Sequence, residues 1–218
     1  ERLTIGGFWK KIDRPIEAVS FQQGGTLFTT FANAPEAQLY GAEAEVQKFF
    51  ALADEGFFGD RRLMVSANYT FTNSKLKVRE GDTTRPVNGG GADVPATDYF
   101  TDGAALTGQS DHVANLQLGF QRDGALSEQT LMLTYASDRI TQRGPGDTPD
   151  LIERPGLRLD LVLREEIQIG RRPFEAKLEI RNITGTGYRE SQTVGESVIY
   201  NNKYDLGTSF ALGLTAKF

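Results

Sequence analysis

The feature of this sequence that most restricts its fold is alternation, because apolar and polar residues exchange places over long stretches. A strand sends successive side chains to opposite faces, so a period of two predicts strands with one apolar and one polar face. In the segment 157–164, four leucines alternate with Arg158, Asp160, Val162 and Arg164. Helical periodicity is scarce, and the sequence therefore predicts an all-β protein.

Eight strands are expected, and most of them reach the length of about 9–11 residues that a tilted membrane strand needs. They span 2–13, 37–50, 61–75, 111–122, 129–141, 155–169, 174–185 and 203–218. The links between them alternate in length. Short or middling links at 51–60, 121–127 and 170–173 alternate with long ones at 14–36, 76–110, 142–154 and 186–202. Short turns on one side and long loops on the other are typical of antiparallel transmembrane β-barrels. Structureless loops of this length are uncommon in compact domains.

Composition excludes several classes of function. The net charge of −5 and the absence of a basic run give no reason to expect a nucleic-acid partner. There is no cysteine, which removes disulfides, thiol nucleophiles and cysteine zinc sites, and His112 is the only histidine. No metal, cofactor or catalytic residue is therefore expected. The mean hydropathy of −0.39 is that of a soluble protein, but a membrane barrel gives a similar average because its two faces cancel.

Four stretches resemble the C-terminal barrel of TonB-dependent outer-membrane receptors. They are GFWKKIDRPI at 7–16, APEAQLYGAEAE at 34–45, LEIRNITGTGYRE at 178–190 and YDLG at 204–207, the last followed by Thr208 where the family usually has Arg. Each pattern is short, but they occur in family order and spacing over nearly the whole chain.

The resemblance implies a fold, a location and a function. The family barrel has 22 strands, so residues 1–218 would be its C-terminal part, with long extracellular loops and short periplasmic turns. The sequence also begins at Glu1 within an alternating pattern, which suggests a piece of a longer protein. The plug domain and the TonB box would lie upstream. The function implied is active uptake of a scarce nutrient (ferric siderophore, cobalamin, carbohydrate or similar) across the outer membrane of a Gram-negative bacterium, with no reaction catalysed.

The resemblance also implies partners: outer-membrane lipid, the receptor's own plug, TonB, the barrel-assembly machinery and the nutrient ligand. On the apolar face we expect one continuous outer surface, formed by Leu116, Leu118, Leu161, Leu163, Leu178, Ile180, Leu212 and Leu214. On the opposite face we expect side chains that meet the plug across the lumen: Glu43, Glu45, Arg158, Asp160, Arg164, Lys177, Glu179 and Arg181. The aromatic residues Phe8, Trp9 and Tyr135 suit the membrane interfaces.

Two smaller groups complete the expected sites. Tyr99 and Phe100 are expected as an exposed aromatic pair on a long loop, able to stack on a ligand, and Arg143 and Asp147 are added as loop contacts. The closing stretch SFALGLTAKF ends on an aromatic residue and resembles the signal that the assembly machinery reads, through Phe210, Gly213, Ala216 and Phe218.

Two alternatives remain open at this stage. A complete eight-stranded outer-membrane barrel, porin-like or adhesive, would show a regular hydrogen-bond ladder between 2–13 and 203–218. A soluble β-sandwich that binds a ligand would show the leucines packed face to face between two sheets.

Overall fold

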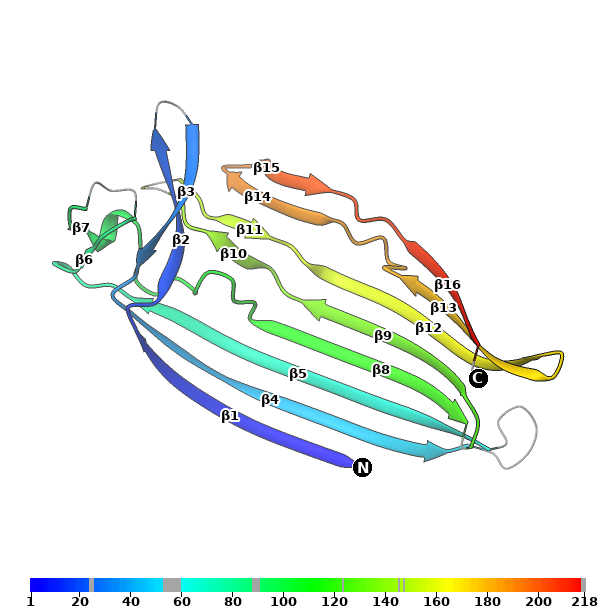
Figure 1. Cartoon of the computed structure of the whole chain (residues 1–218). Coiled ribbons are helices and arrows are strands. Elements are labelled where there is room, and N and C mark those ends of the chain that lie inside the picture. Colours follow the sequence, from blue (N-terminus) through cyan, green and yellow to red (C-terminus); the bar gives the residue numbers. More distant parts are fainter. Residues whose placement is uncertain are drawn as a thin grey trace.

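The computed structural model describes residues 1–23, 26–52, 60–87, 91–122, 124–144, 146 and 148–216. Its main feature is one sheet of eight antiparallel strands, which we call the wall (Figure 1). The eight strands lie in the sheet in the same order as in the sequence. These strands are β1 (Arg2–Asp13), β4 (Glu36–Ala51), β5 (Arg61–Lys77), β8 (His112–Arg122), β9 (Ser127–Ala136), β12 (Gly156–Ile169), β13 (Arg172–Arg181) and β16 (Ser209–Ala216). The prediction of an all-β protein with eight wall strands is confirmed.

The long links contain further strands that the sequence analysis did not predict. Two of them form hairpins, and a four-stranded sheet, β10-β11-β14-β15, continues the wall beyond four of its strands. The additional elements are β2 (Ile16–Gln23), β3 (Thr26–Asn33), β6 (Thr83–Thr84), β7 (Val94–Pro95), a 3-10 helix η2 (Ala96–Asp98), β10 (Arg139–Gln142), β11 (Leu151–Glu153), β14 (Tyr188–Val194) and β15 (Ser197–Tyr204). They gather at one end of the wall, which we call the loop end (Figure 1).

Three predicted strands had the wrong bounds, because they crossed the boundary between the wall and the four-stranded sheet. The range 129–141 is divided between β9 and β10, 174–185 stops at Arg181, and 203–218 contains the end of β15 before β16 begins. At this boundary Asn182 and Gly207 have left-handed backbone conformations, with φ of 56° and 66°. The Asn182 amide also donates to the carbonyls of Thr186 (3.0 Å) and Gly207 (2.8 Å), so it holds two of the interrupted strands together.

The strand register sorts the side chains into two faces. Leu118, Leu131, Leu161, Ile180 and Phe210 form one cross-strand row from β8 to β16. Directly paired residues lie on the same face of an antiparallel sheet. Parallel rows on this leucine face include Leu116–Leu133–Leu159 and Leu163–Leu178–Leu212, while Leu214 follows Leu212 two residues later. The prediction that these leucines and Ile180 form one continuous surface is therefore confirmed.

The opposite, polar face carries the charges in the expected register. Arg164 pairs with Glu175 at 2.8 Å and with Glu128 at 3.4 Å. Arg181 pairs with Glu179 at 2.9 Å. All eight predicted polar-face residues lie on this side of their strands. The charges thus neutralise one another along the wall, as predicted.

The two edge strands do not meet. Within the described residues β1 pairs with β4 and β16 with β13, and no ladder joins β1 to β16. The alternative of a closed eight-stranded barrel is therefore wrong. The sandwich is wrong as well, because the leucine face is not packed against a second sheet and Leu212 is 84% exposed.

Aromatic residues mark both ends of the leucine face. Trp9 lies opposite Tyr40 near the loop end, with Tyr69 and Tyr135 on the same face. Phe50 lies near the other end, ten residues after Tyr40 on β4, which is about 33 Å along the strand. A tilt of about 40° reduces this to about 25 Å, the height of the apolar band of an outer-membrane barrel.

Phe8 does not belong to these girdles, contrary to the prediction. It lies opposite Gly41 on the polar face, one residue out of phase with Trp9. A Cβ on Gly41 would fall 2.6 Å from Cζ of Phe8 and 2.0 Å from the carbonyl oxygen of Phe71. The ring therefore covers a position that only glycine can occupy.

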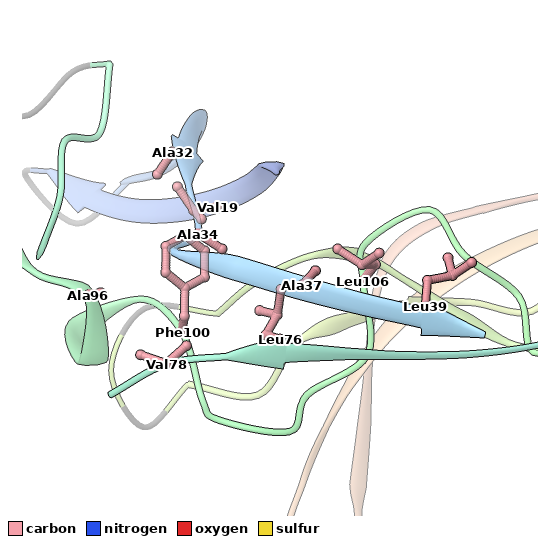
Figure 2. Close-up of a cluster of buried hydrophobic side chains, with 10 residues drawn as sticks. All are labelled: Val19, Ala32, Ala34, Ala37, Leu39, Leu76, Val78, Ala96, Phe100 and Leu106. Carbon is pink, nitrogen blue, oxygen red and sulfur yellow. The ribbon is translucent and has the colours of Figure 1, made fainter. Parts of the chain in front are cut away.

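The hydrophobic core lies at the loop end, not in the wall. Figure 2 shows buried side chains of β4, β5 and the β2–β3 hairpin in one cluster, with the Phe100 ring beside Ala34 and Val78. The cluster consists of Val19, Ala32, Ala34, Ala37, Leu39, Leu76, Val78, Ala96, Phe100 and Leu106. Leu39 and Ala37 belong to the polar face of β4, so the loops pack over that face at its outer end.

Candidate functional site

The β2–β3 hairpin contacts the end of β10 and so links distant parts of the wall. The backbone N–H of Ser20 donates to the carbonyl of Arg143 (2.8 Å), and the N–H of Arg143 donates to that of Ala18 (2.9 Å). The hydroxyl of Thr29 donates to Oε1 of Gln142 at 3.0 Å, and the Gln142 amide also bonds the hydroxyl of Ser20. The hairpin is thereby fixed over the loops of the polar face.

Arg143 joins three loops through its buried guanidinium. Only 2% of the residue is exposed. It donates to Oε2 of Glu17 on the hairpin at 2.8 and 3.1 Å, and to Oδ2 of Asp150 on its own loop at 3.0 Å. It also bonds the carbonyl of Ala105 in the loop that follows β7. We call Arg143, Glu17 and Asp150 the loop hub.

Glu17 is held as tightly as Arg143. Its carboxylate is 1% exposed and accepts the backbone N–H of Thr107 at 3.2 and 3.3 Å in addition to the Arg143 bonds. Burial raises the pKa of Glu17 and outweighs the opposing attraction of Arg143. Two desolvated charges of this kind depend on each other, because either one alone would be a buried unpaired charge.

The four predicted ligand-contact residues lie in different surroundings. Tyr99 and Arg143 line a cavity of about 270 Å³, together with Thr97, Asp98 and Thr148. Phe100 also borders this cavity, but its ring is only 2% exposed and belongs to the core. The expectation of an exposed Tyr99–Phe100 pair is therefore wrong for Phe100; the two rings lie 6.4 Å apart at their centroids. Asp147 lies outside the described residues.

A second, larger cavity of about 590 Å³ opens at the base of the hairpin. It lies between the ends of β1 and β3 and the loop that carries β6 and β7. Its lining is mostly polar: Arg14, Asn33, Ala34, Pro35, Gly81, Asp82, Thr83, Thr84, Arg85 and Asp93. Within it Arg85 donates to Asp93 at 2.9 Å, and this hydrogen bond lowers the pKa of Asp93.

A carboxylate also organises the four-stranded sheet at the loop end. Glu190 accepts hydrogen bonds from Thr141 (2.6 Å), Asn201 (2.7 Å) and Asn202 (2.8 Å), which come from β10 and β15. Burial raises the pKa of Glu190, but these hydrogen bonds together bring it below its ordinary value. The charged form therefore stabilises this sheet.

Lower on the polar face, Glu43 and Glu45 line a small pocket between β1 and β5. Glu45 pairs with Arg2 at 3.5 Å, and both side chains are largely exposed. Four of the predicted charges of β12 and β13, namely Arg164, Lys177, Glu179 and Arg181, border a separate shallow pocket of about 330 Å³. This face thus presents paired, water-accessible charges to whatever fills the space beside it.

The remaining sequence motifs have local roles or lie beyond the description. His112 pairs with the hydroxyl of Tyr69 at 2.7 Å on the leucine face. Phe210, Gly213 and Ala216 lie on β16 at the wall edge, and Phe218 falls outside the described residues. In the described part of the chain no group of three or more His, Cys, Asp or Glu side chains is placed to hold a metal ion. No described helix is long and apolar enough to cross a membrane.

Sequence reasoning missed Glu17, Asp150 and Arg14. Glu17 has a signal in retrospect, since it shares a strand face with the apolar residue Val19. A charge on such a face predicts a buried ion pair. Its partner lies 126 residues away, so local pattern cannot name it.

An open antiparallel wall with one leucine face, one charged face and loops packed over one end has the form of part of a membrane β-barrel. A family model described as "TonB dependent receptor-like, beta-barrel" matches residues 1–212. The chain belongs to this family, whose members are outer-membrane β-barrel transporters and not enzymes. Comparison with curated proteins and with solved structures gave no match.

Proposed function

We propose that this chain forms part of the wall and several extracellular loops of a TonB-dependent receptor that takes up a scarce nutrient. Residues 1–218 make the C-terminal part of a 22-stranded barrel, and the open edges of β1 and β16 pair with further strands of the same receptor. Unpaired edges are not tolerated in a bilayer, because each unsatisfied backbone group costs several kcal/mol.

The observation that supports this best is that the wall has one apolar face and one charged face. The leucine face suits lipid, because an Arg placed at the bilayer midplane of such a face costs about 2–4 kcal/mol. The charged face suits water and a plug domain, whose own charges would meet those of β12 and β13. TonB acts on the plug, the loop end faces the medium, and β16 carries the signal for barrel assembly.

Cysteine labelling tests this arrangement, since the chain has no native cysteine. Leu161→Cys and Val162→Cys are adjacent on β12 but on opposite faces. In outer-membrane fractions of cells that produce the full-length protein, a membrane-impermeant charged maleimide should leave Leu161→Cys unmodified. A lipid-soluble maleimide should modify it, whereas Val162→Cys should show no such preference for the lipid-soluble reagent.

Transport is tested separately. Growth on the limiting nutrient should require both this protein and TonB, and dissipating the inner-membrane proton gradient should stop uptake without stopping ligand binding. Uptake that continues in a strain without TonB would contradict the proposal, as would labelling of Leu161→Cys by the charged reagent.

A further inference from the structure

The 590 Å³ cavity at the hairpin base contains polar groups that the protein does not use. The Arg14 side chain makes no hydrogen bond or ion pair within the described residues, and it acts on Asp93 only through space. Thr83 is exposed, and its hydroxyl likewise bonds no described group. The Asp82 carboxylate accepts one N–H from the described residues, that of Arg79 at 2.8 Å through Oδ2. A guanidinium fork, a hydroxyl and a carboxylate oxygen are thus left for a ligand or water.

The cavity is also balanced in charge. Arg14 and Arg85 contribute two positive charges, and Asp82 and Asp93 contribute two negative ones. A polyanionic ligand such as a ferric chelate needs a surplus of cations to replace its lost hydration. The lining offers no such surplus, and the Arg85 charge is already paired with Asp93.

Among the described residues, Ala34 and Pro35 are the only apolar side chains of the lining. A ligand with a large aromatic ring would find no aromatic side chain to stack on here, and a peptide would find no pocket for apolar side chains. What the lining does offer is donors and acceptors close together, in a volume suited to a small ligand.

We propose, resting on the transport function above, that this cavity binds a neutral saccharide of two or three units. Vicinal hydroxyls each donate and accept, so one face of a sugar can satisfy a guanidinium fork and a carboxylate together. A separate cavity of about 270 Å³ at the loop end has related chemistry, because the Tyr99 ring lies beside Thr97 and Asp98.

Isothermal titration of the full-length protein tests this binding. The protein is purified in a detergent without a sugar head group, so that the detergent cannot compete. The probes are cellobiose, lactose, maltose, xylobiose and their trisaccharide homologues, with cellobiuronic acid and ferric dicitrate as the anionic comparisons. At least one neutral saccharide should bind, and more tightly than either anionic probe.

Variants then locate the site. Thr83→Val keeps the shape and removes the hydroxyl, and should weaken binding about fivefold, the effect of one neutral hydrogen bond. Arg14→Gln should weaken it about tenfold or more, and Arg14→Lys nearly as much, because lysine keeps the charge but lacks the fork. Thr193→Val, an exposed threonine of β14 outside both cavities, is the matched control and should bind as the wild type does.

Three results would overturn the proposal: no neutral saccharide binds, an anionic probe binds more tightly, or the Thr83 and Arg14 variants bind normally. None of them decides the proposed transport function, because cysteine labelling and TonB-dependent growth are measured without reference to the ligand class.

Discussion

The wall and the loop end of this chain are stabilised by opposite means. Ten of the twelve buried hydrophobic residues in the described part belong to the loop-end cluster, whereas the wall displays its leucines outward. The loop end also buries charge: Glu17 and Arg143 are almost completely enclosed, while the ion pairs of β12 and β13 remain accessible. The stability of the wall therefore depends on the medium around its leucine face. The stability of the loop end depends on the packing of its own side chains.

This difference matters for the transport function proposed above. A wall whose register is fixed by every backbone hydrogen bond has little freedom to rearrange. The loops are held by a small number of specific contacts that a ligand or a substitution can disturb. The comparison predicts that damage to the hub will loosen the loops and leave the wall intact, and that damage to the leucine face will do the reverse.

The largest effect is expected from Arg143→Leu. It removes three sets of contacts and leaves Glu17 as a buried unpaired charge, which typically costs about 3–5 kcal/mol. Hydrogen exchange should show loss of protection in β2, β3 and the segment 104–107, with β4 and β12 unchanged. The double variant Arg143→Leu/Glu17→Leu removes the stranded charge and should recover much of the loss. Equal protection in the single variant and the wild type would contradict the role of the hub.

A somewhat smaller effect is expected from Leu161→Arg on the leucine face. An arginine near the bilayer midplane costs about 2–4 kcal/mol, and denaturant titration in lipid vesicles measures it. The control Val162→Arg lies one residue away on the polar face, opposite Glu179, and should change stability by about 1 kcal/mol at most. If Val162→Arg proved the more damaging, the assignment of the two faces would be reversed.

Gly41→Ala should destabilise the wall by about 1–3 kcal/mol, as overpacking does, because the new methyl group meets a carbonyl oxygen of β5 and the ring of Phe8. Gly7→Ala on the paired strand is the control. A Cβ at Gly7 meets only a backbone oxygen, at 3.8 Å, so the same titration should show little change there.

The smallest effect is expected from pH. The folded-state pKa of Glu190 is lowered, so its stabilising contribution is complete above the unfolded pKa of about 4.3 and is lost as pH falls through the folded value. The change should be about 1 kcal/mol or less, visible as faster hydrogen exchange in β14 and β15 after correction for the intrinsic pH dependence. Glu190→Gln should be insensitive over the same range; a variant that retained the full pH response would assign it to another group.

The sequence predicted the wall well because a strand's facing is a local property. Alternation in 157–164 placed the leucines and charges of β12 correctly, and the same reasoning worked for β8 and β13. It failed for Phe8, where Gly6 and Gly7 interrupt the alternation. Strand ends were less accurate, since Asn182 ends β13 through its backbone conformation and its bonds to Thr186 and Gly207, which no period of two reveals.

The sequence by itself thus determined the class of fold, the two faces of the wall and the end at which the loops lie. Only the tertiary structure decided how those loops pack. The hairpin contacts β10, and Phe100 is buried while Tyr99 borders a cavity. Arg143 pairs with Glu17 and does not extend into solvent. The physical reason is the range of the interactions. Strand facing follows from the geometry of adjacent residues, whereas burial at the loop end depends on contacts between segments about 90 to 130 residues apart, for which a local pattern carries no signal.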